Sequence, residues 1–318
     1  MTDTSSSQIR TIRCSGEEIP DMPFPVAPPA DDVTPLELLL ELPSRAALRR
    51  TLAAADIAAE LDDDDDAEQF LNELSQVELR QAAAQARYAA PQTVHYFRLS
   101  GLTDVSPSEL DDLIDSRGFG GQVRAVEELH DRVYVVCSIP EDGTQAQLSV
   151  SEDARVTTVA TFDLGTDLLA VRADDGDLAA GTVQALRDHP DLSEWTSVSL
   201  RDDGFRGRFE DAAVAAYEQL SLSVTSVGAG TERIDVTGEE RGDSGRADVR
   251  GDDVVDDLLS RSDTDRSTAQ ARIDFRTADM IPTDPSVRID FDESSVEFRQ
   301  WVPERTLIQL DRTIQDAE

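Results

Sequence analysis

Two arginines alternate with two phenylalanines in one short segment of the chain, GFRGRFED, at residues 204–211. Phe205 and Phe209 flank Arg206 and Arg208 there. Guanidinium groups bind phosphate in a bidentate manner, and aromatic faces stack on bases. Residue types at this spacing could contact a nucleic acid or another partner, and we take all four as candidate binding residues.

The same segment also has a purely structural interpretation. Phe205 and Phe209 could both be anchors in a hydrophobic core, while the arginines pair with nearby carboxylates. Those carboxylates belong to Asp202, Asp203 and Glu210. We favour the structural interpretation here and keep the binding interpretation open.

A second group of basic residues consists of Arg45, Arg49 and Arg50. Arg45 and Arg49 are four residues apart, so in a helix they share one face. Such a face could meet a phosphate backbone or an acidic partner. The sequence therefore offers these three arginines as a second candidate site for a protein or nucleic-acid partner.

Several classes of site are excluded or weakened by composition. All 29 basic residues are arginine, which excludes a Schiff-base lysine and a phosphate-loop lysine. The three histidines and two cysteines show no zinc-ligand spacing. Cys137 lies in an apolar run and is predicted to be buried and inert, so a disulfide to Cys14 has little support. We predict no metal and no cofactor, in a reducing compartment.

The remaining chemical candidates have simpler explanations. The aspartates at 62–66 lack the spacing and glycine of a calcium loop, so they predict a solvated turn. The glycines at 118–121 follow a predicted helix end, where carbonyls and not amides point outward. His189 lies where a predicted helix ends, and the helix dipole favours a cation there, so we predict a capping role for it. Carboxylate pairs such as Asp290 and Asp292 are expected by chance in so acidic a chain, and no G-x-S-x-G occurs. Catalysis is less expected than binding.

The net charge of −37 indicates where the protein works. The Debye length is about 8 Å at physiological ionic strength and about 3 Å in molar salt, where the repulsion largely disappears. We therefore predict a protein of an extremely halophilic, archaeal-like cytoplasm. The apolar runs are far shorter than the roughly 18 residues of a membrane span, and no secretory signal is visible.

The chain divides by composition into four parts. Residues 1–32 are rich in serine and proline and predict a flexible arm. Residues 33–90 predict a helical domain, which begins at Thr34, Pro35 and Glu37 with a capping box. Residues 91–230 predict an α+β sheet domain. Residues 231–318 predict a second sheet segment, which the sequence allows to be continuous with the preceding one.

Beyond residue 91 the pattern changes from helical spacing to alternation. The predicted strands cover 94–99, 133–139, 145–150, 156–162, 168–172, 196–200, 222–227, 233–236, 269–275, 286–291 and 296–301. The predicted helices cover 106–117, 177–187, 209–220 and 253–260, and residues 304–316 are ambiguous. The fold class is therefore α+β: a small N-terminal helical domain followed by a curved, mostly antiparallel sheet domain with a few helices.

The order of these elements resembles the centromere protein N family. The resemblance is carried by LELLLELP at 36–43, YVV at 134–136, LLAV at 168–171, TVQAL at 182–186, VSL at 198–200 and FRGRFEDAAVAAY at 205–217. It implies a non-catalytic adaptor with a helical head that recognises a nucleoprotein surface. Basic residues of such heads contact DNA, and the positions that correspond are Arg45, Arg49 and Arg50. The sheet domain of such proteins dimerises or docks a partner.

The sequence thus predicts a non-catalytic binding or scaffold protein, an adaptor in a chromosome- or nucleoprotein-associated assembly. A carboxylate-based hydrolase with a dispersed site and a nucleic-acid-associated regulator stay open as alternatives. The expected partner is a protein, with nucleic acid and a further copy of the chain as open possibilities and no membrane.

Overall fold

The structure of the protein is a computed structural model. It describes residues 33–58, 61, 67–99, 123–129, 132–140, 155–163, 166–174, 176–187, 195–226, 230–239, 246–261, 264–273 and 286–317. The predicted arm at 1–32, the aspartates at 62–66, the strand at 145–150, the helix at 106–117 with its glycines, and His189 lie outside these residues. No described helix has the length and apolar character needed to cross a lipid bilayer.

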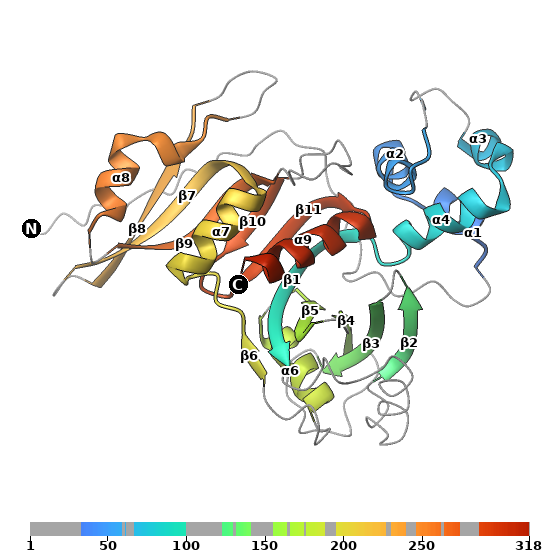
Figure 1. The fold of residues 1–318 in the computed structure, drawn as a ribbon, viewed down its shortest axis with the longest axis horizontal. Coiled ribbons are helices and arrows are strands. Elements are labelled where there is room, and N and C mark those ends of the chain that lie inside the picture. Colours follow the sequence, from blue (N-terminus) through green and yellow to red (C-terminus); the bar gives the residue numbers. More distant parts are fainter. Residues whose placement is uncertain are drawn as a thin grey trace, which may run out of the picture.

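Four short helices form the N-terminal part of the described chain (Figure 1). They are α1 (Pro35–Leu40), α2 (Arg45–Ala54), α3 (Ala67–Glu73) and α4 (Gln76–Ala86). The predicted capping box of α1 is present, since Thr34 Oγ1 accepts from Glu37 N and Glu37 in turn accepts from Thr34 N at 2.8 Å. Leucines and alanines of the four helices pack into their own buried cluster. We call α1–α4 the helical head.

The rest of the described chain is built on one large sheet of 11 strands. The strands are β1 (Ala90–Leu99), β2 (Val123–Leu129), β3 (Arg132–Pro140), β4 (Arg155–Phe162), β5 (Leu168–Arg172), β6 (Trp195–Ser197), β7 (Val214–Ser226), β8 (Gly230–Thr237), β9 (Thr264–Ile273), β10 (Ser286–Asp290) and β11 (Ser295–Val302). Their order is β2-β3-β4-β5-β1-β11-β10-β9-β7-β8, with β6 also paired to β1. The predicted α+β class is confirmed. The boundary predicted near residue 230 falls at the β7–β8 hairpin, within this sheet.

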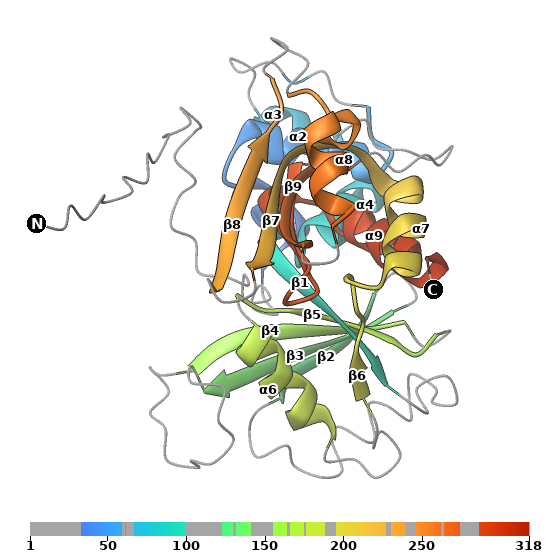
Figure 2. The ribbon, with the colours of Figure 1, turned by 90° about the vertical axis from the view of Figure 1, so that its left-hand side faces the viewer.

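The two halves of the sheet are covered on opposite faces (Figures 1 and 2). The helix α6 (Gly176–Arg187) packs on β3, β4 and β5, while α7 (Asp203–Ala213), α8 (Asp253–Leu259) and α9 (Glu304–Asp316) cover the half from β1 to β7. The short 3-10 turn η4 (Val249–Gly251) precedes α8. Each half therefore has a hydrophobic core of its own, on opposite sides of the sheet.

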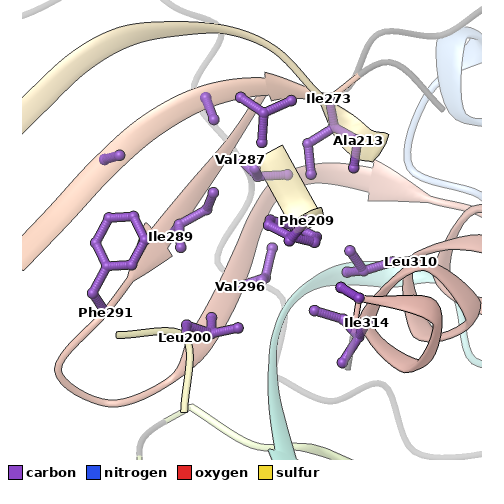
Figure 3. Close-up of a cluster of buried hydrophobic side chains, with 14 of the residues drawn as sticks. Leu200, Phe209, Ala213, Ile273, Val287, Ile289, Phe291, Val296, Leu310 and Ile314 are labelled. Atoms are coloured by element: carbon purple, nitrogen blue, oxygen red, sulfur yellow. The ribbon is translucent and has the colours of Figure 1, made fainter. Parts of the chain in front are cut away.

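The larger core lies between α7, α9 and strands β7, β9, β10, β11 and β1. Figure 3 labels ten of its side chains: Leu200, Phe209, Ala213, Ile273, Val287, Ile289, Phe291, Val296, Leu310 and Ile314. Alternation along the strands produces this surface, because every second residue of β10 points to the same face. The helix α9 lies near the middle of the molecule, with contacts to α2, α4, α7 and β5.

Most predicted strands are present with shifted ends, and three predictions need comment. The predicted helix at 209–220 is wrong, since a helix ends at Ala213 and β7 begins at Val214. The helix starts instead at Asp203, with Asp202 as its cap. The ambiguous segment at 304–316 is a helix, and the strand β2 was not predicted.

Candidate functional site

A polar hollow with a volume of about 470 Å³ lies on the sheet face opposite α7 and α9. Strands β7 to β11 form its floor. Alternation explains the position: Ala269 and Val287 point into the core, so their neighbours Thr268, Gln270 and Arg288 point to the other side. The polar residues that line the hollow are Gln219, Ser221, Arg233, Thr268, Gln270, Ser286, Arg288, Arg299 and Gln300.

The strand register places these side chains in rows across the floor. Gln219 of β7 pairs with Gln270 of β9, which pairs with Arg288 of β10, and Arg288 pairs with Glu297 of β11. Side chains directly opposite each other on one face have Cβ atoms about 5 Å apart. Two amides, a guanidinium and a carboxylate therefore form one continuous row.

The three arginines of the hollow differ in how closely they are paired with carboxylates. Arg288 lies 3.6 Å from Asp290 and 3.6 Å from Glu297, and its side chain is 41% exposed. Arg299 Nε lies 3.0 Å from Glu297 Oε1. Arg233 donates through Nη2 to Ser221 Oγ at 2.9 Å and through Nε to Asp235 at 3.1 Å. Exposed ion pairs of this kind contribute about 0–1 kcal/mol, so the guanidinium groups can exchange partners at little cost.

The predicted cluster at 205–209 lies on α7, and its two halves have different surroundings. Phe205 and Phe209 are buried in the larger core, with ring centroids 6.3 Å apart. This corrects their assignment as binding residues, because buried rings cannot stack on a base. Arg206 pairs with Asp203 and lies 3.6 Å from Glu210, and Arg208 donates to Ala317 O. The structural interpretation of this segment is the one observed; binding by the two arginines stays a prediction.

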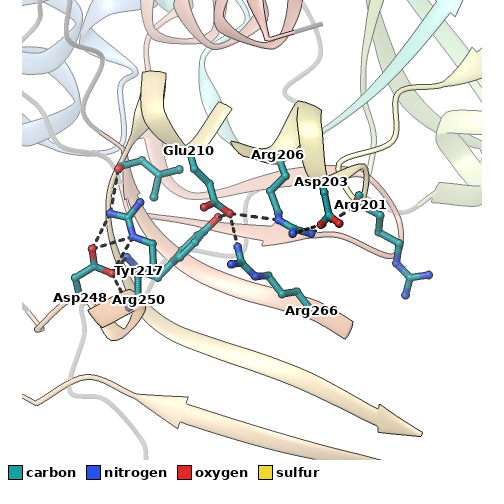
Figure 4. Close-up of polar contacts among 9 residues, drawn as sticks. Arg201, Asp203, Arg206, Glu210, Tyr217, Asp248, Arg250 and Arg266 are labelled. Atoms are coloured by element: carbon teal, nitrogen blue, oxygen red, sulfur yellow. Dashed lines mark hydrogen bonds and ion pairs between the residues drawn. The ribbon is translucent and has the colours of Figure 1, made fainter. Parts of the chain in front are cut away.

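Glu210 continues into a polar network between α7 and the sheet (Figure 4). It accepts from Tyr217 Oη at 2.9 Å and pairs with Arg266. Arg250 lies 5.3 Å from the centroid of the Tyr217 ring and pairs with Asp248. Burial, and then the charge of Glu210, raise the pKa of Tyr217. The tyrosine therefore stays neutral and donates a hydrogen bond, which is a structural role.

Arg45, Arg49 and Arg50 lie on α2 of the helical head. Arg49 is exposed and donates to Leu61 O at 3.1 Å, whereas Arg50 donates to Trp301 O at 3.5 Å. Arg50 therefore faces the N-terminal side of α9, and Arg208 reaches the C-terminal side. The structure does not bring the two arginine groups together, since the 13 residues of α9 separate them by about 20 Å.

The joint between the head and the sheet is made by side chains that the sequence did not single out. Trp301 Nε1 donates to Thr51 Oγ1 at 3.3 Å. Arg305 donates through its backbone to Gln85 Oε1 at 2.8 Å and through Nη1 to Asp56 at 2.7 Å. These contacts connect α2 and α4 to the end of β11 and the start of α9. No local pattern identifies them, because the partners are about 220 to 250 residues apart.

Two buried ion pairs fasten α9 to the sheet. Arg172 Nη2 donates to Glu304 Oε2 at 2.8 Å, and the side chains are 2% and 0% exposed. Tyr134 Oη donates to Glu304 at 3.0 Å. Burial disfavours the charge of Arg172, but the carboxylate outweighs burial and raises the pKa of the guanidinium. The guanidinium group of Arg172 is thus held ionised in the interior.

The second pair joins Arg132 to Asp311, about two turns further along the same face of α9. Tyr96 Oη donates to Asp311 at 3.0 Å, and Arg132 also lies 3.2 Å from Asp163. Burial, and then the charge of Asp311, raise the pKa of Tyr96. Glu304 and Asp311 are seven residues apart and so share one helix face, which is the only local signal that the sequence carried for them.

Cys137 is completely buried in the smaller core, and burial raises the pKa of its thiol to about 12. A thiolate fraction of roughly one in ten thousand at pH 8 follows, and the thiolate is the reactive form. We expect Cys137 in a Cys14→Ser variant to resist a thiol reagent at pH 8 in the folded state. One thiol per chain should react after unfolding. Labelling of the folded protein at the rate of a free thiol would contradict this burial.

The predicted carboxylate pair has a local structural role. Asp290 accepts from the backbone N–H groups of Asp292 and Glu293 at 3.0 Å each, in the turn between β10 and β11. Asp292 pairs with Arg201. Among the described residues, no group of three His, Cys, Asp or Glu side chains is arranged to hold a metal ion. The polar hollow presents arginine and amide groups, which can hydrogen-bond to an anion.

Comparison with models of known protein families gives no match for this chain. Comparison with curated proteins gives no match either.

Proposed function

We propose that this protein is a non-catalytic binding or scaffold protein, an adaptor that holds two recognition surfaces at a fixed angle. The observation that carries the proposal is the joint between the helical head and the sheet. A head that moved freely would need only a linker, whereas here Trp301 and Arg305 bond to three separate points of the head. The orientation of α2 relative to the sheet is therefore specified by the fold.

The interior supports the same proposal. The buried charges of α9 are paired with arginines and tyrosines that connect strands to helix. Arrangements of this kind fix the geometry of a core and need not add much stability. In an adaptor, such fixed geometry keeps the surface of the head and the surface of the sheet in one relative position.

The assembly that we propose is associated with a chromosome or another nucleoprotein, in a cytoplasm of high salt. The exposed Arg49 and its neighbour Arg45 on α2 would provide the contact from the head. Phosphate contacts lose affinity as salt rises, so in molar salt a few well-placed arginines must act through short-range hydrogen bonds. A protein partner is the expected binder of this surface, and a nucleic acid bound with it fits the same chemistry.

A capture experiment tests this proposal. The tagged protein is purified from its host in 2 M KCl, and the bound proteins and nucleic acids are quantified against the bait. We expect a partner in stoichiometric amount, and we expect the double variant Arg45→Gln, Arg49→Gln to lose most of it. Arg50 stays unchanged because it bonds to Trp301 O in the joint.

The matched control is Arg80→Gln, which removes an exposed arginine from α4 in the same head. Capture by this variant should equal that of the unchanged protein. Equal capture by the double variant would remove α2 from the interface, and recovery of the bait alone would refute the adaptor function.

The alternative of a carboxylate-based enzyme needs desolvated acids around a cavity. The hollow on the described sheet face is lined instead by arginine, amide and hydroxyl groups. This lining favours binding over acid and base catalysis.

A further inference from the structure

The polar hollow differs from the chain as a whole in its charge. The protein carries a net charge of −37, yet the side chains that line the hollow include three arginines, three glutamines and no carboxylate. The carboxylates that pair with these arginines are at the edge of the hollow and not among its lining residues: Asp235, Asp290 and Glu297, the last at the end of the row through Arg288. Counted together with these three carboxylates, the three arginines leave the hollow and its edge close to neutral, whereas the chain as a whole is strongly negative.

Each guanidinium is already in contact with an oxyanion, which indicates the ligand chemistry. Arg299 contacts Glu297 at 3.0 Å, and Arg288 approaches the same carboxylate only to 3.6 Å. Asp290 approaches Arg288 to the same 3.6 Å. Both carboxylates are thus beyond hydrogen-bond distance from Arg288, so an oxyanion inside the hollow could accept hydrogen bonds from its guanidinium group.

The size of the hollow limits the ligand. A volume of about 470 Å³ lies within the range of small-molecule sites, which is about 300–1,000 Å³. Gln219 and Gln270 lie in the same row as Arg288, with Ser221 and Thr268 one step along the strands. Amide and hydroxyl groups both donate and accept, so they can recognise a polar body attached to the anion.

We propose that this hollow binds a small ligand of nucleotide size, with a phosphate or carboxylate held by Arg288 and Arg299. The glutamines of β7 and β9 hydrogen-bond to its polar body. Arg233 has a different role, because it bonds to Ser221 and Thr268 and so holds the floor together. The site lies on the sheet and is separate from α2, so it goes beyond the proposed adaptor function and does not depend on it.

Calorimetric titration in 2 M KCl tests the site, with ATP, inorganic triphosphate and citrate as probes. We expect saturable binding of ATP or citrate at one site per chain. The probe that binds identifies phosphate or carboxylate as the anion. In the double variant Arg288→Gln, Arg299→Gln, the affinity for the bound probe should fall at least tenfold, since hydrogen bonds to charged groups are strong.

Two control variants keep this result interpretable. Arg261→Gln removes an arginine of similar exposure that pairs with Asp257 on α8, and it should leave the dissociation constant unchanged. Gln270→Ala should weaken the binding of ATP several-fold. It should leave the binding of triphosphate unchanged, because triphosphate has no polar body for Gln270 to contact. Melting temperatures of the arginine variants should stay close to that of the unchanged protein, because the altered arginines are exposed.

Three results would overturn the proposal. The first is the absence of saturable binding of either ATP or citrate at millimolar concentration. The second is binding that the arginine double variant retains in full. The third is tighter binding of a ten-residue oligothymidylate than of ATP, which would assign the hollow to a nucleic-acid backbone.

Discussion

Replacing Glu304 with glutamine is expected to lower the free energy of unfolding by about 3–5 kcal/mol. The substitution keeps the shape of the side chain and removes its charge. Arg172 would then be a buried cation without its carboxylate, at 2% exposure. Its other contacts, with Tyr88 O at 3.2 Å and the ring of Tyr134 at 5.5 Å, cannot replace a full negative charge.

Glu304 also lies in the first turn of α9, where the helix dipole favours negative charge. The substitution therefore removes two favourable interactions at once. Urea unfolding in 2 M KCl, followed by circular dichroism, measures the difference between the variant and the unchanged protein. The transition midpoint should fall, with little change in its slope.

Two further variants separate the charge effect from a general packing effect. Glu297→Gln removes the carboxylate of an exposed pair and should cost no more than about 1 kcal/mol. The double variant Arg172→Leu, Glu304→Leu should regain much of the lost stability, because replacing both charges leaves neither one buried alone. If Glu304→Gln and Glu297→Gln had equal effects, the pair would not be buried as described.

The sequence predicted best what depends on neighbouring residues. The capping box of Thr34 and Glu37 is set within four residues, and it is present as predicted. Strands with a clear alternation or a run of apolar residues, such as β5, are also present. Both signals act over a few residues, so they do not require knowledge of the rest of the fold.

The error at 209–220 has a long-range cause. Phe209, Ala213 and Tyr217 are spaced by four residues, which favours a helix. The chain beyond Ala213 instead pairs with β8 and β9, and this pairing satisfies the backbone groups of Val214 onward. The helix starts after its cap Asp202 and includes both Gly204 and Gly207.

The hollow and the buried pairs could not be predicted for a related reason. Alternating polar residues at Thr268 and Gln270 indicate one exposed strand face, but not which strand lies beside it. The row through Gln270 and Arg288 exists only through the register of three strands. Similarly, Arg172 and Glu304 are 132 residues apart, and no local pattern identifies one as the partner of the other.

Replacing Phe209 with alanine is expected to cost about 3–5 kcal/mol of stability, as large-to-small substitutions of buried aromatic residues do. Phe209 is 2% exposed and stacks on Phe205 beneath α7. Its neighbours in the core include Leu310 and Ile314 of α9 (Figure 3). The truncation would leave a cavity between the two helices and the sheet, which the close-packed surroundings can fill only in part.

The comparison with Phe209→Leu decides between a core residue and a ligand contact. Leucine retains an apolar side chain of nearly the same burial, so this variant should lose no more than about 1.5 kcal/mol. A ligand-binding phenylalanine would give the opposite pattern, with stability unchanged in both variants and partner capture lost in both. Urea unfolding of the isolated protein and partner capture in 2 M KCl, measured on the same two variants, distinguish these roles. We expect the difference between alanine and leucine to be large in stability, because the ring of Phe209 packs against α9 and does not face solvent.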